Sequence, residues 1–201
     1  MLELPRGRYR TNEDSLLLAA FAPRVRGTVF DLGAGVGVVG LAIAVASPEA
    51  KIVLVERDPD AVLVAQKNAE GLSRVRVLGG DVRTIANAHR GEASLVVCNP
   101  PYVPEGRGRA PRSGKRDAKM GDADPFLAAA RTLLGRRGSA CFCYPTTNLL
   151  DFLAAMRKRG LEPKRIRLVH AGAEKPARLA LIETKAAKRG GLVIDPPLFG
   201  S

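Results

Sequence analysis

The feature that most constrains the fold is the regular alternation of short apolar runs with helical patterns. The apolar runs are typical of buried strands and cover 28–31, 51–56, 75–79, 94–99 and 139–144. Helical patterns lie between and after these runs, at 38–46, 59–72, 84–89, 124–135 and 148–160. Strands and helices that alternate through short connections predict a parallel sheet with helices on both faces.

The last third of the chain predicts a different connection. Two apolar segments, 163–170 and 177–185, are separated by a short link that contains Gly and Pro, and we expect an antiparallel hairpin. The expected fold is therefore α/β, with a seven-stranded, mostly parallel sheet of the doubly wound, Rossmann-like type and a C-terminal antiparallel hairpin. The tail 186–201 and the segment 104–123 are rich in Gly, Pro, Arg or Lys, and we expect both to be flexible.

Length and composition favour one domain over residues 1–201. A chain of 201 residues that is 46% hydrophobic can bury one substantial core. No run approaches the roughly 20 apolar residues of a membrane span, and the N-terminus does not resemble a signal peptide, so we expect a cytoplasmic protein that does not contact membranes. The three cysteines, Cys98, Cys141 and Cys143, lie in predicted strands rather than at metal-ligand spacing, which predicts core residues and no metal site.

The basic charge suggests a polyanionic partner. The formal net charge is +12, and this favours nucleic acid, although a GC-rich genome would also enrich arginine. The segment 102–124 concentrates basic residues, and Arg107, Arg109 and Arg112 are candidate phosphate contacts. A solvated loop with no RNA contact is the alternative for each of these side chains.

A glycine-rich stretch, "FDLGAGVGVVG", follows the first predicted strand and opens the next helix. A dinucleotide fingerprint, G-x-G-x-x-G, would need a third glycine where this chain has Val38. Asp31 stands directly before the loop, where a carboxylate would repel a pyrophosphate but attract an ammonium group. S-adenosylmethionine (SAM) carries an ammonium and no phosphate, so the loop predicts SAM rather than NAD.

Three further polar residues follow predicted strands. Glu56 is placed to accept hydrogen bonds from ribose hydroxyls, and Asp81 from the adenine amine of the cofactor. Asn99 ends the fourth strand, and the carboxyl ends of parallel strands meet at one edge of a sheet. Each residue alone could be an ordinary turn residue.

The tetrapeptide Asn99-Pro100-Pro101-Tyr102 predicts the catalytic site. An amine conjugated with a ring is a weak nucleophile, and acceptors for its hydrogens would aim its lone pair at a methyl donor. Asn99 offers a side-chain carbonyl and Pro100 a main-chain carbonyl, while the prolines fix the backbone. Tyr102 offers a face on which a base can stack.

The glycine loop and this tetrapeptide together resemble the class I SAM-dependent amino-methyltransferases. The segments "RYRTNEDSLLLAAFA" and "ARLALIETKAAKRGGLVIDPPL" are similar to the bacterial tRNA adenine-N(6) methyltransferases that modify a valine tRNA beside its anticodon. The resemblance implies that residues 1–27 form a helix and cofactor lid and that 102–124 form a substrate loop. It implies cofactor-binding residues at eight positions, of which the last also grips the target: Asn12, Asp14, Asp31, Gly33, Gly35, Glu56, Asp81 and Asn99.

Other functions share the same tetrapeptide. A glutamine-amide methyltransferase acting on a release factor is one alternative, although such enzymes usually carry an additional N-terminal helical domain. A guanine-amine methyltransferase of ribosomal RNA and a DNA adenine methyltransferase are others. A non-catalytic RNA-binding module is a further alternative, and it would fail to bind or use SAM.

Overall fold

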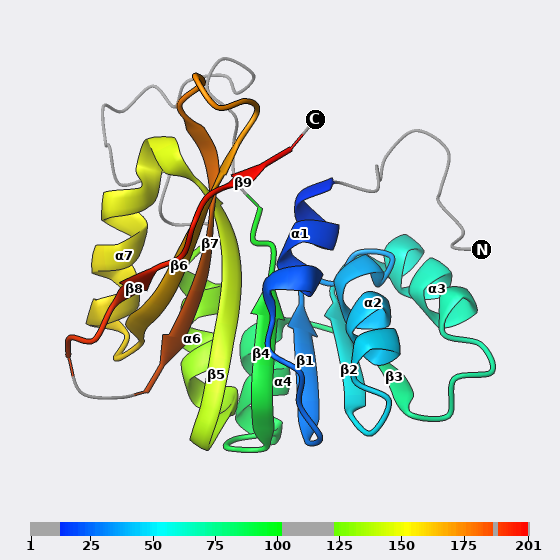
Figure 1. Cartoon of the computed structure of the whole chain (residues 1–201). Helices are drawn as coiled ribbons and strands as arrows, with labels where there is room; N and C mark the ends of the chain where they lie inside the picture. Colours follow the sequence, from blue (N-terminus) through cyan, green and yellow to red (C-terminus); the bar gives the residue numbers. More distant parts are fainter. Residues whose placement is uncertain (1–12, 102–122, 187–188, 201) are drawn as a thin grey trace, which may run out of the picture.

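The computed structural model describes residues 13–101, 123–186 and 189–200. A single sheet runs through it in the strand order β3-β2-β1-β4-β5-β7-β6-β8, and β9 also pairs with β6 (Figure 1). The strands are β1 Thr28–Leu32, β2 Lys51–Glu56, β3 Val75–Gly79, β4 Ala93–Cys98, β5 Leu134–Pro145, β6 Glu162–His170, β7 Ala177–Lys185, β8 Val193–Ile194 and β9 Leu198–Phe199. Strands β1 to β5 are mutually parallel, and β7 is antiparallel to both β5 and β6. The predicted α/β class and the hairpin are confirmed.

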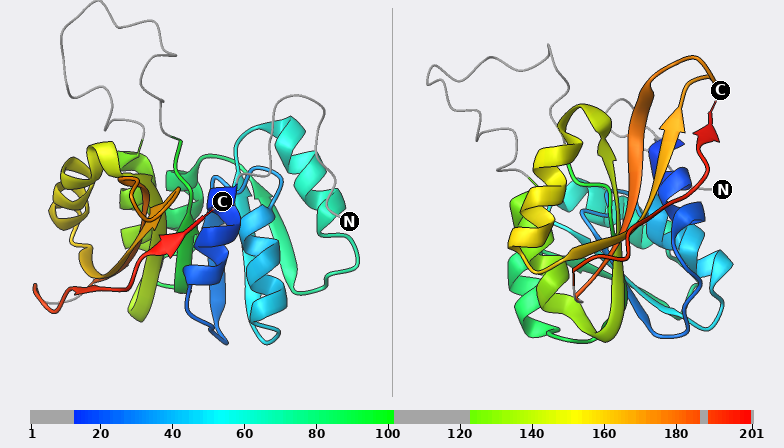
Figure 2. Two further views of the ribbon diagram at one scale, coloured as in Figure 1. Left: turned by 45° about the horizontal axis from the view of Figure 1, so that its top comes forward. Right: turned by 60° about the vertical axis from the view of Figure 1, so that its left-hand side comes forward.

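Helices cover both faces of this sheet (Figure 2). The helices are α1 Glu13–Phe21, α2 Val38–Ala46, α3 Pro59–Asn68, α4 Val82–Ala88, α6 Asp124–Leu133 and α7 Leu149–Lys158, with a 3-10 turn, η1, at Thr146–Asn148. Buried side chains of α1, α2 and α3 share one apolar cluster, and those of α4, α6 and α7 share the other. The sheet therefore separates two cores, as a doubly wound fold requires.

Strand β5 shows how the sequence builds both cores at once. Phe142 and Tyr144 face the α6 and α7 side, where the Tyr144 ring stacks on Phe152 with centroids 3.9 Å apart. Cys141 and Cys143 alternate with them and face the α1 and α2 side. Both thiols are free and buried, and burial raises their pKa values well above the usual range. Their predicted role as small core residues fits this arrangement.

The tail corrects two expectations. Among the described residues the sheet has nine strands rather than seven, because β8 and β9 add to β6 in parallel, so the described part of the tail is paired with the sheet rather than free. Its Gly and Pro content suggested disorder, but ion pairs and backbone bonds hold it to the sheet. Asp195 pairs with Arg165 at 3.3 Å and with Arg167 at 3.5 Å, and Lys164 donates to the Gly190 carbonyl at 2.6 Å.

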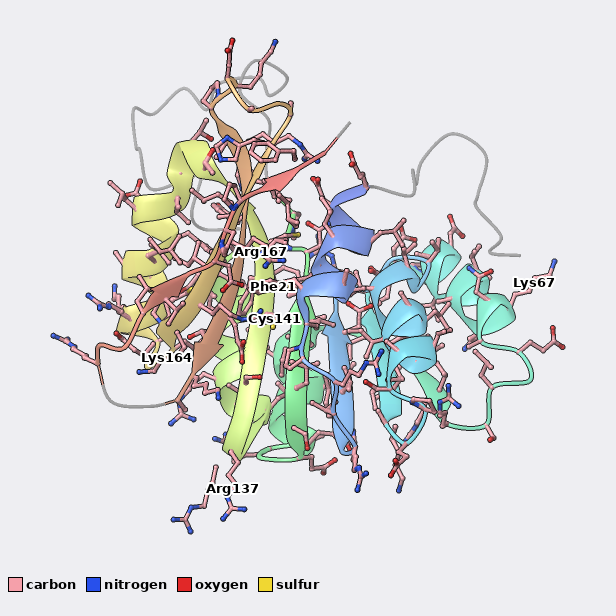
Figure 3. All side chains as sticks on the ribbon, viewed as in Figure 1. Phe21, Lys67, Arg137, Cys141, Lys164 and Arg167 are labelled. Carbon is pink, nitrogen blue, oxygen red and sulfur yellow. The ribbon has the colours of Figure 1, made fainter. Side chains whose placement is uncertain are left out.

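Arg165 also joins the tail to α1. Its Nη2 donates to the Phe21 carbonyl at 2.8 Å, its guanidinium lies 4.0 Å from the centre of the Phe21 ring, and its Nε pairs with Glu183 at 3.0 Å. Figure 3 labels Phe21, Arg167 and Lys164 in this part of the molecule. The C-terminal end of α1 is thereby fixed to β6, β7 and the tail.

The boundaries of several elements differ from those expected. Strand β5 begins at Leu134, so α6 ends at Leu133 rather than at 135, and α3 ends at Asn68 rather than at 72. No helix in the described ranges is both long and apolar enough to cross a membrane.

Candidate active site

A cavity of about 590 Å³ opens at the carboxyl ends of the parallel strands. This volume lies within the range of pockets that hold small molecules and cofactors. Six residues that were predicted to form the site line it, Gly33, Gly35, Glu56, Asp81, Asn99 and Pro101, together with Arg57, Asp58, Val82, Arg83, Pro125 and Phe126. The structure therefore brings the glycine loop, the carboxylates of Glu56 and Asp81, and the residues Asn99 and Pro101 to one place.

The glycine loop takes a backbone form that other residues rarely adopt. Gly33, Gly35 and Gly37 have φ angles of 68°, 55° and 91°, in the left-handed region. The amide of Gly33 donates to the Val55 carbonyl at 2.9 Å, which ties the loop to the end of β2. A Cβ atom at position 33 would lie 3.0 Å from the Phe126 ring, so the loop passes close to α6 as well.

Glu56 is held in place by backbone donors. Its Oε2 accepts a hydrogen bond from the Gly35 amide at 2.8 Å, and its Oε1 accepts from the amides of Arg57 and Asp58 at 2.8 and 2.9 Å. A carboxylate oxygen accepts about two hydrogen bonds, so Oε2 retains capacity for a ligand hydroxyl. The half-buried carboxylate is thus oriented by the same loop that borders the cavity.

Asp81 serves both the fold and the cavity. It is the N-cap of α4, where its Oδ1 accepts from the Arg83 amide at 2.9 Å. Hydrogen bonds from Arg83, first from its backbone and then from its side chain, hold the Asp81 pKa below its usual range. The carboxylate is exposed and remains ionised as an acceptor at neutral pH.

Asp31 lies behind the loop rather than on the cavity wall. It is 1% exposed, and its Oδ2 accepts from the Gly40 amide in α2 at 2.8 Å. Burial raises its pKa to about 7, the Gly40 hydrogen bond opposes this rise, and the negative charge of Glu56 adds to it. A nearby cation would favour the ionised form of this carboxyl group.

The first turn of α1 contacts Asn99, which borders the cavity. Asp14 is 5% exposed and accepts from Nη1 of Arg178, in β7, at 2.5 Å. Next to it, Ser15 accepts a hydrogen bond from Nδ2 of Asn99 at 3.3 Å. Sequence reasoning named Asp14 but missed Ser15 and Arg178, because their partners lie 84 and 164 residues away along the chain.

The tetrapeptide begins where β4 ends. Strand β4 stops at Cys98, and the two prolines that follow Asn99 have no backbone N–H with which to continue it. Pro100 is buried, whereas Pro101 is exposed at the cavity. The predicted site residues Asn12, Tyr102, Arg107, Arg109 and Arg112 lie outside the described residues. In the described part of the chain, no group of three or more His, Cys, Asp or Glu could hold a metal ion.

Two of the missed cavity residues come from α6. Pro125 and Phe126 stand at the start of this helix, and both are half-buried at the cavity. The segment 124–135 was recognised only as a helix, since Pro within the first turn and a following Phe are common in structural helices as well. Their place beside Gly33 follows from the tertiary fold.

Comparison with known proteins identifies this arrangement. The family model for the methyltransferase small domain matches residues 12–140. The tRNA1(Val) (adenine(37)-N6)-methyltransferase of Shewanella halifaxensis is 31% identical over 192 residues, which cover 92% of this chain and 74% of that protein. The release factor glutamine methyltransferase of Mycolicibacterium smegmatis is 37% identical over 123 residues, covering 59% of this chain and 41% of that protein.

Solved structures share the fold. A protein from Agrobacterium tumefaciens described as a predicted O-methyltransferase superposes with a TM-score of 0.73 at 24% identity, covering 92% of this chain and 86% of that one. TYW2 of M. jannaschii, solved in complex with AdoMet, gives a TM-score of 0.59 at 16% identity, with 86% and 73% covered. These similarities confirm the Rossmann-like class I fold.

The family match covers the glycine loop, the three carboxylates at or behind the cavity, and Asn99. It confirms the prediction of a methyltransferase that uses SAM as its cofactor. The cavity fits this cofactor, because its lining offers acceptors for hydroxyl and amine groups and a close backbone approach at the glycines. The chain belongs to the methyltransferase small-domain family.

Proposed function

We propose that this enzyme transfers the methyl group of SAM to the exocyclic 6-amino group of an adenine in RNA, in a tRNA near the anticodon. The observation that carries the proposal is the position of Asn99 and Pro101 on the wall of the cavity that also contains Gly35, Glu56 and Asp81. A residue suited to hold an amine thus borders the place where the methyl donor binds.

The cofactor side of the cavity would hold SAM through acceptors. When bound, SAM supplies an electrophilic methyl group on a sulfonium sulfur. Glu56 has capacity to accept from the ribose hydroxyls, and Asp81 from the adenine amine. Asp31 would stabilise the ammonium group from behind the loop, and pairing with a cation would lower its raised pKa.

The target side would prepare the amine. The Asn99 side-chain oxygen and the Pro100 carbonyl accept the two amine hydrogens, which draws the nitrogen toward a tetrahedral shape and aims its lone pair. The amine proton becomes acidic once the nitrogen carries positive charge, so no strong general base is required. Tyr102 and the basic residues of 102–124, outside the described residues, would stack on the base and contact phosphates.

The choice of RNA is supported by two observations. The formal net charge of +12 suits a polyanionic substrate. The similarity to the tRNA1(Val) methyltransferase of Shewanella halifaxensis extends over 92% of the chain, including the C-terminal hairpin, whereas that to the release factor methyltransferase covers 59%. A glutamine-amide substrate is the second candidate, because a glutamine amide nitrogen presents the same two hydrogens to Asn99.

The decisive experiment offers both substrates. Purified enzyme is incubated with methyl-labelled SAM and, in separate reactions, unmodified total RNA or a release factor, followed by nucleoside and peptide mass spectrometry. We expect label in N6-methyladenosine from the tRNA fraction. Label in methylguanosine from ribosomal RNA or in methylglutamine would replace the proposed substrate, and label in none of them would contradict the function itself.

A further inference from the structure

The contact between Ser15 and Asn99 has a chemical consequence for the proposed reaction. The Nδ2 group of Asn99 donates to Oγ of Ser15 at 3.3 Å, and both side chains are half-buried. Ser15 lies in the first turn of α1, whereas Asn99 directly follows β4. The contact therefore fixes one end of the Asn99 amide to a separate element of the fold.

The orientation of this amide matters because its two ends have opposite roles. The carbonyl oxygen accepts hydrogen bonds, and the NH₂ group only donates them. A target amine offers hydrogens, so an amide turned by 180° would place NH₂ against NH₂ and lose the interaction. The reaction needs Oδ1 toward the target and Nδ2 away from it.

The two residues that follow Asn99 cannot donate a backbone hydrogen bond to its side-chain oxygen. An asparagine at the start of a turn commonly accepts from the backbone N–H two residues later, which uses up its side-chain oxygen. Here that position is Pro101, which has no N–H, and neither has Pro100. Neither of these two residues can occupy the oxygen, and a partner of Nδ2 can therefore set the orientation of the amide.

The turn that carries Ser15 is itself held firmly. Its neighbour Asp14 accepts from Arg178 of β7 at 2.5 Å, and Arg178 also pairs with Glu13 at 3.3 Å. Helix α1 packs against α2, β5 and β7. The hydroxyl of Ser15 is therefore presented to Asn99 from a fixed support.

We propose that Ser15 is a positioning residue, which holds Nδ2 of Asn99 so that its oxygen faces the target amine. The proposal rests on the proposed function for the identity of the reaction. It assigns to the first turn of α1 a role in methyl transfer that is separate from any contact of this turn with the cofactor.

Steady-state kinetics of two variants test this role. Ser15→Ala removes the acceptor, and Ser15→Thr keeps a hydroxyl at the same position. We expect kcat to fall about tenfold in Ser15→Ala, which corresponds to one side-chain hydrogen bond, and to stay within about twofold of wild type in Ser15→Thr. The Kd for SAM should be unchanged in both. Equal kcat losses in the two variants, or none in Ser15→Ala, would overturn the proposal.

A second readout does not depend on the substrate. The side-chain amide signals of Asn99 in the NMR spectrum are identified by their absence from Asn99→Ala. We expect their exchange with solvent to be several-fold faster in Ser15→Ala than in wild type, and unchanged exchange would overturn the proposal. If neither RNA nor release factor accepts a methyl group, the proposed function fails, while this measurement still decides whether Ser15 holds the amide.

Discussion

The two sides of the cavity are organised in different ways. On the cofactor side, Glu56 is fixed by the amides of Gly35, Arg57 and Asp58, and Asp81 by the amide of Arg83. On the target side, Asn99 is held by a side chain 84 residues away. The cofactor side therefore depends on backbone amides of the segments that follow β1, β2 and β3, and the target side depends on the packing of α1. Substitutions on the two sides should separate cofactor binding from methyl transfer.

The largest effect is expected from Asn99→Ala. Loss of the acceptor for the target amine should lower kcat by about 100-fold, with the Kd for SAM nearly unchanged, because the interaction matters only once the target is bound. Single-turnover kinetics with saturating SAM measure this change. A variant that transfers methyl groups at the wild-type rate would remove Asn99 from the reaction.

Charge reversal in the basic segment should weaken RNA binding. The triple variant Arg107→Glu, Arg109→Glu and Arg112→Glu is expected to lower affinity at least tenfold and to flatten its dependence on salt. Electrophoretic mobility shifts across a salt series measure both quantities.

Three arginines at the amino ends of two parallel strands provide a matched control for this prediction. Arg90, Arg136 and Arg137 are exposed near the amino ends of β4 and β5, and Figure 3 shows Arg137 at this end of the molecule. The same reversal there changes the net charge equally. Equal loss of affinity in both triple variants would show that the segment 102–124 has no special part in RNA binding.

The buried carboxylate predicts opposite effects on stability and affinity. Because the pKa of Asp31 is raised to about 7 in the folded state, the native protein binds an extra proton between about pH 4 and 7, and its stability falls as pH rises through that window. Asp31→Asn removes this titration. We expect it to raise the free energy of unfolding by about 1–3 kcal/mol at pH 8 without SAM and to weaken SAM binding about tenfold.

Denaturant unfolding at pH 5 and pH 8, combined with calorimetric titration of SAM, tests this pair of effects. At pH 5 the wild-type protein and Asp31→Asn should have similar free energies of unfolding. An Asp31→Asn variant that binds SAM as wild type does would exclude Asp31 from the cofactor site, even if the stability change were found.

A smaller effect is expected from Gly33→Ala. The added methyl group requires a φ of 68° and meets Phe126 at 3.0 Å, so SAM affinity should fall several-fold and stability by about 1–2 kcal/mol. Gly71→Ala is the matched control, because its φ is 77° and a Cβ there has no neighbour within 4 Å. If Gly71→Ala also lost affinity for SAM, the loss in Gly33→Ala would be attributed to lower stability of the fold rather than to a change in the cofactor site.

The contrast between the two sides also explains what the sequence could predict. Alternating strands and helices, the glycine loop, Glu56 and Asp81 lie in short segments, where spacing along the chain determines position at the sheet edge. Ser15 and Arg178 were missed because their contacts arise only when α1 packs against β5 and β7. The tail was expected to be flexible because its composition does not show the Arg165 and Arg167 side chains that bind Asp195.

The central claim is that cofactor binding and target positioning are separate within one cavity, and parallel calorimetric titrations of SAM into two variants test it most directly. Glu56→Gln retains the shape of the side chain but loses its charge and one acceptor oxygen, and we expect its affinity for SAM to fall at least tenfold. Asn99→Ala should bind SAM with the wild-type Kd. Weak SAM binding by Asn99→Ala together with normal binding by Glu56→Gln would contradict the account.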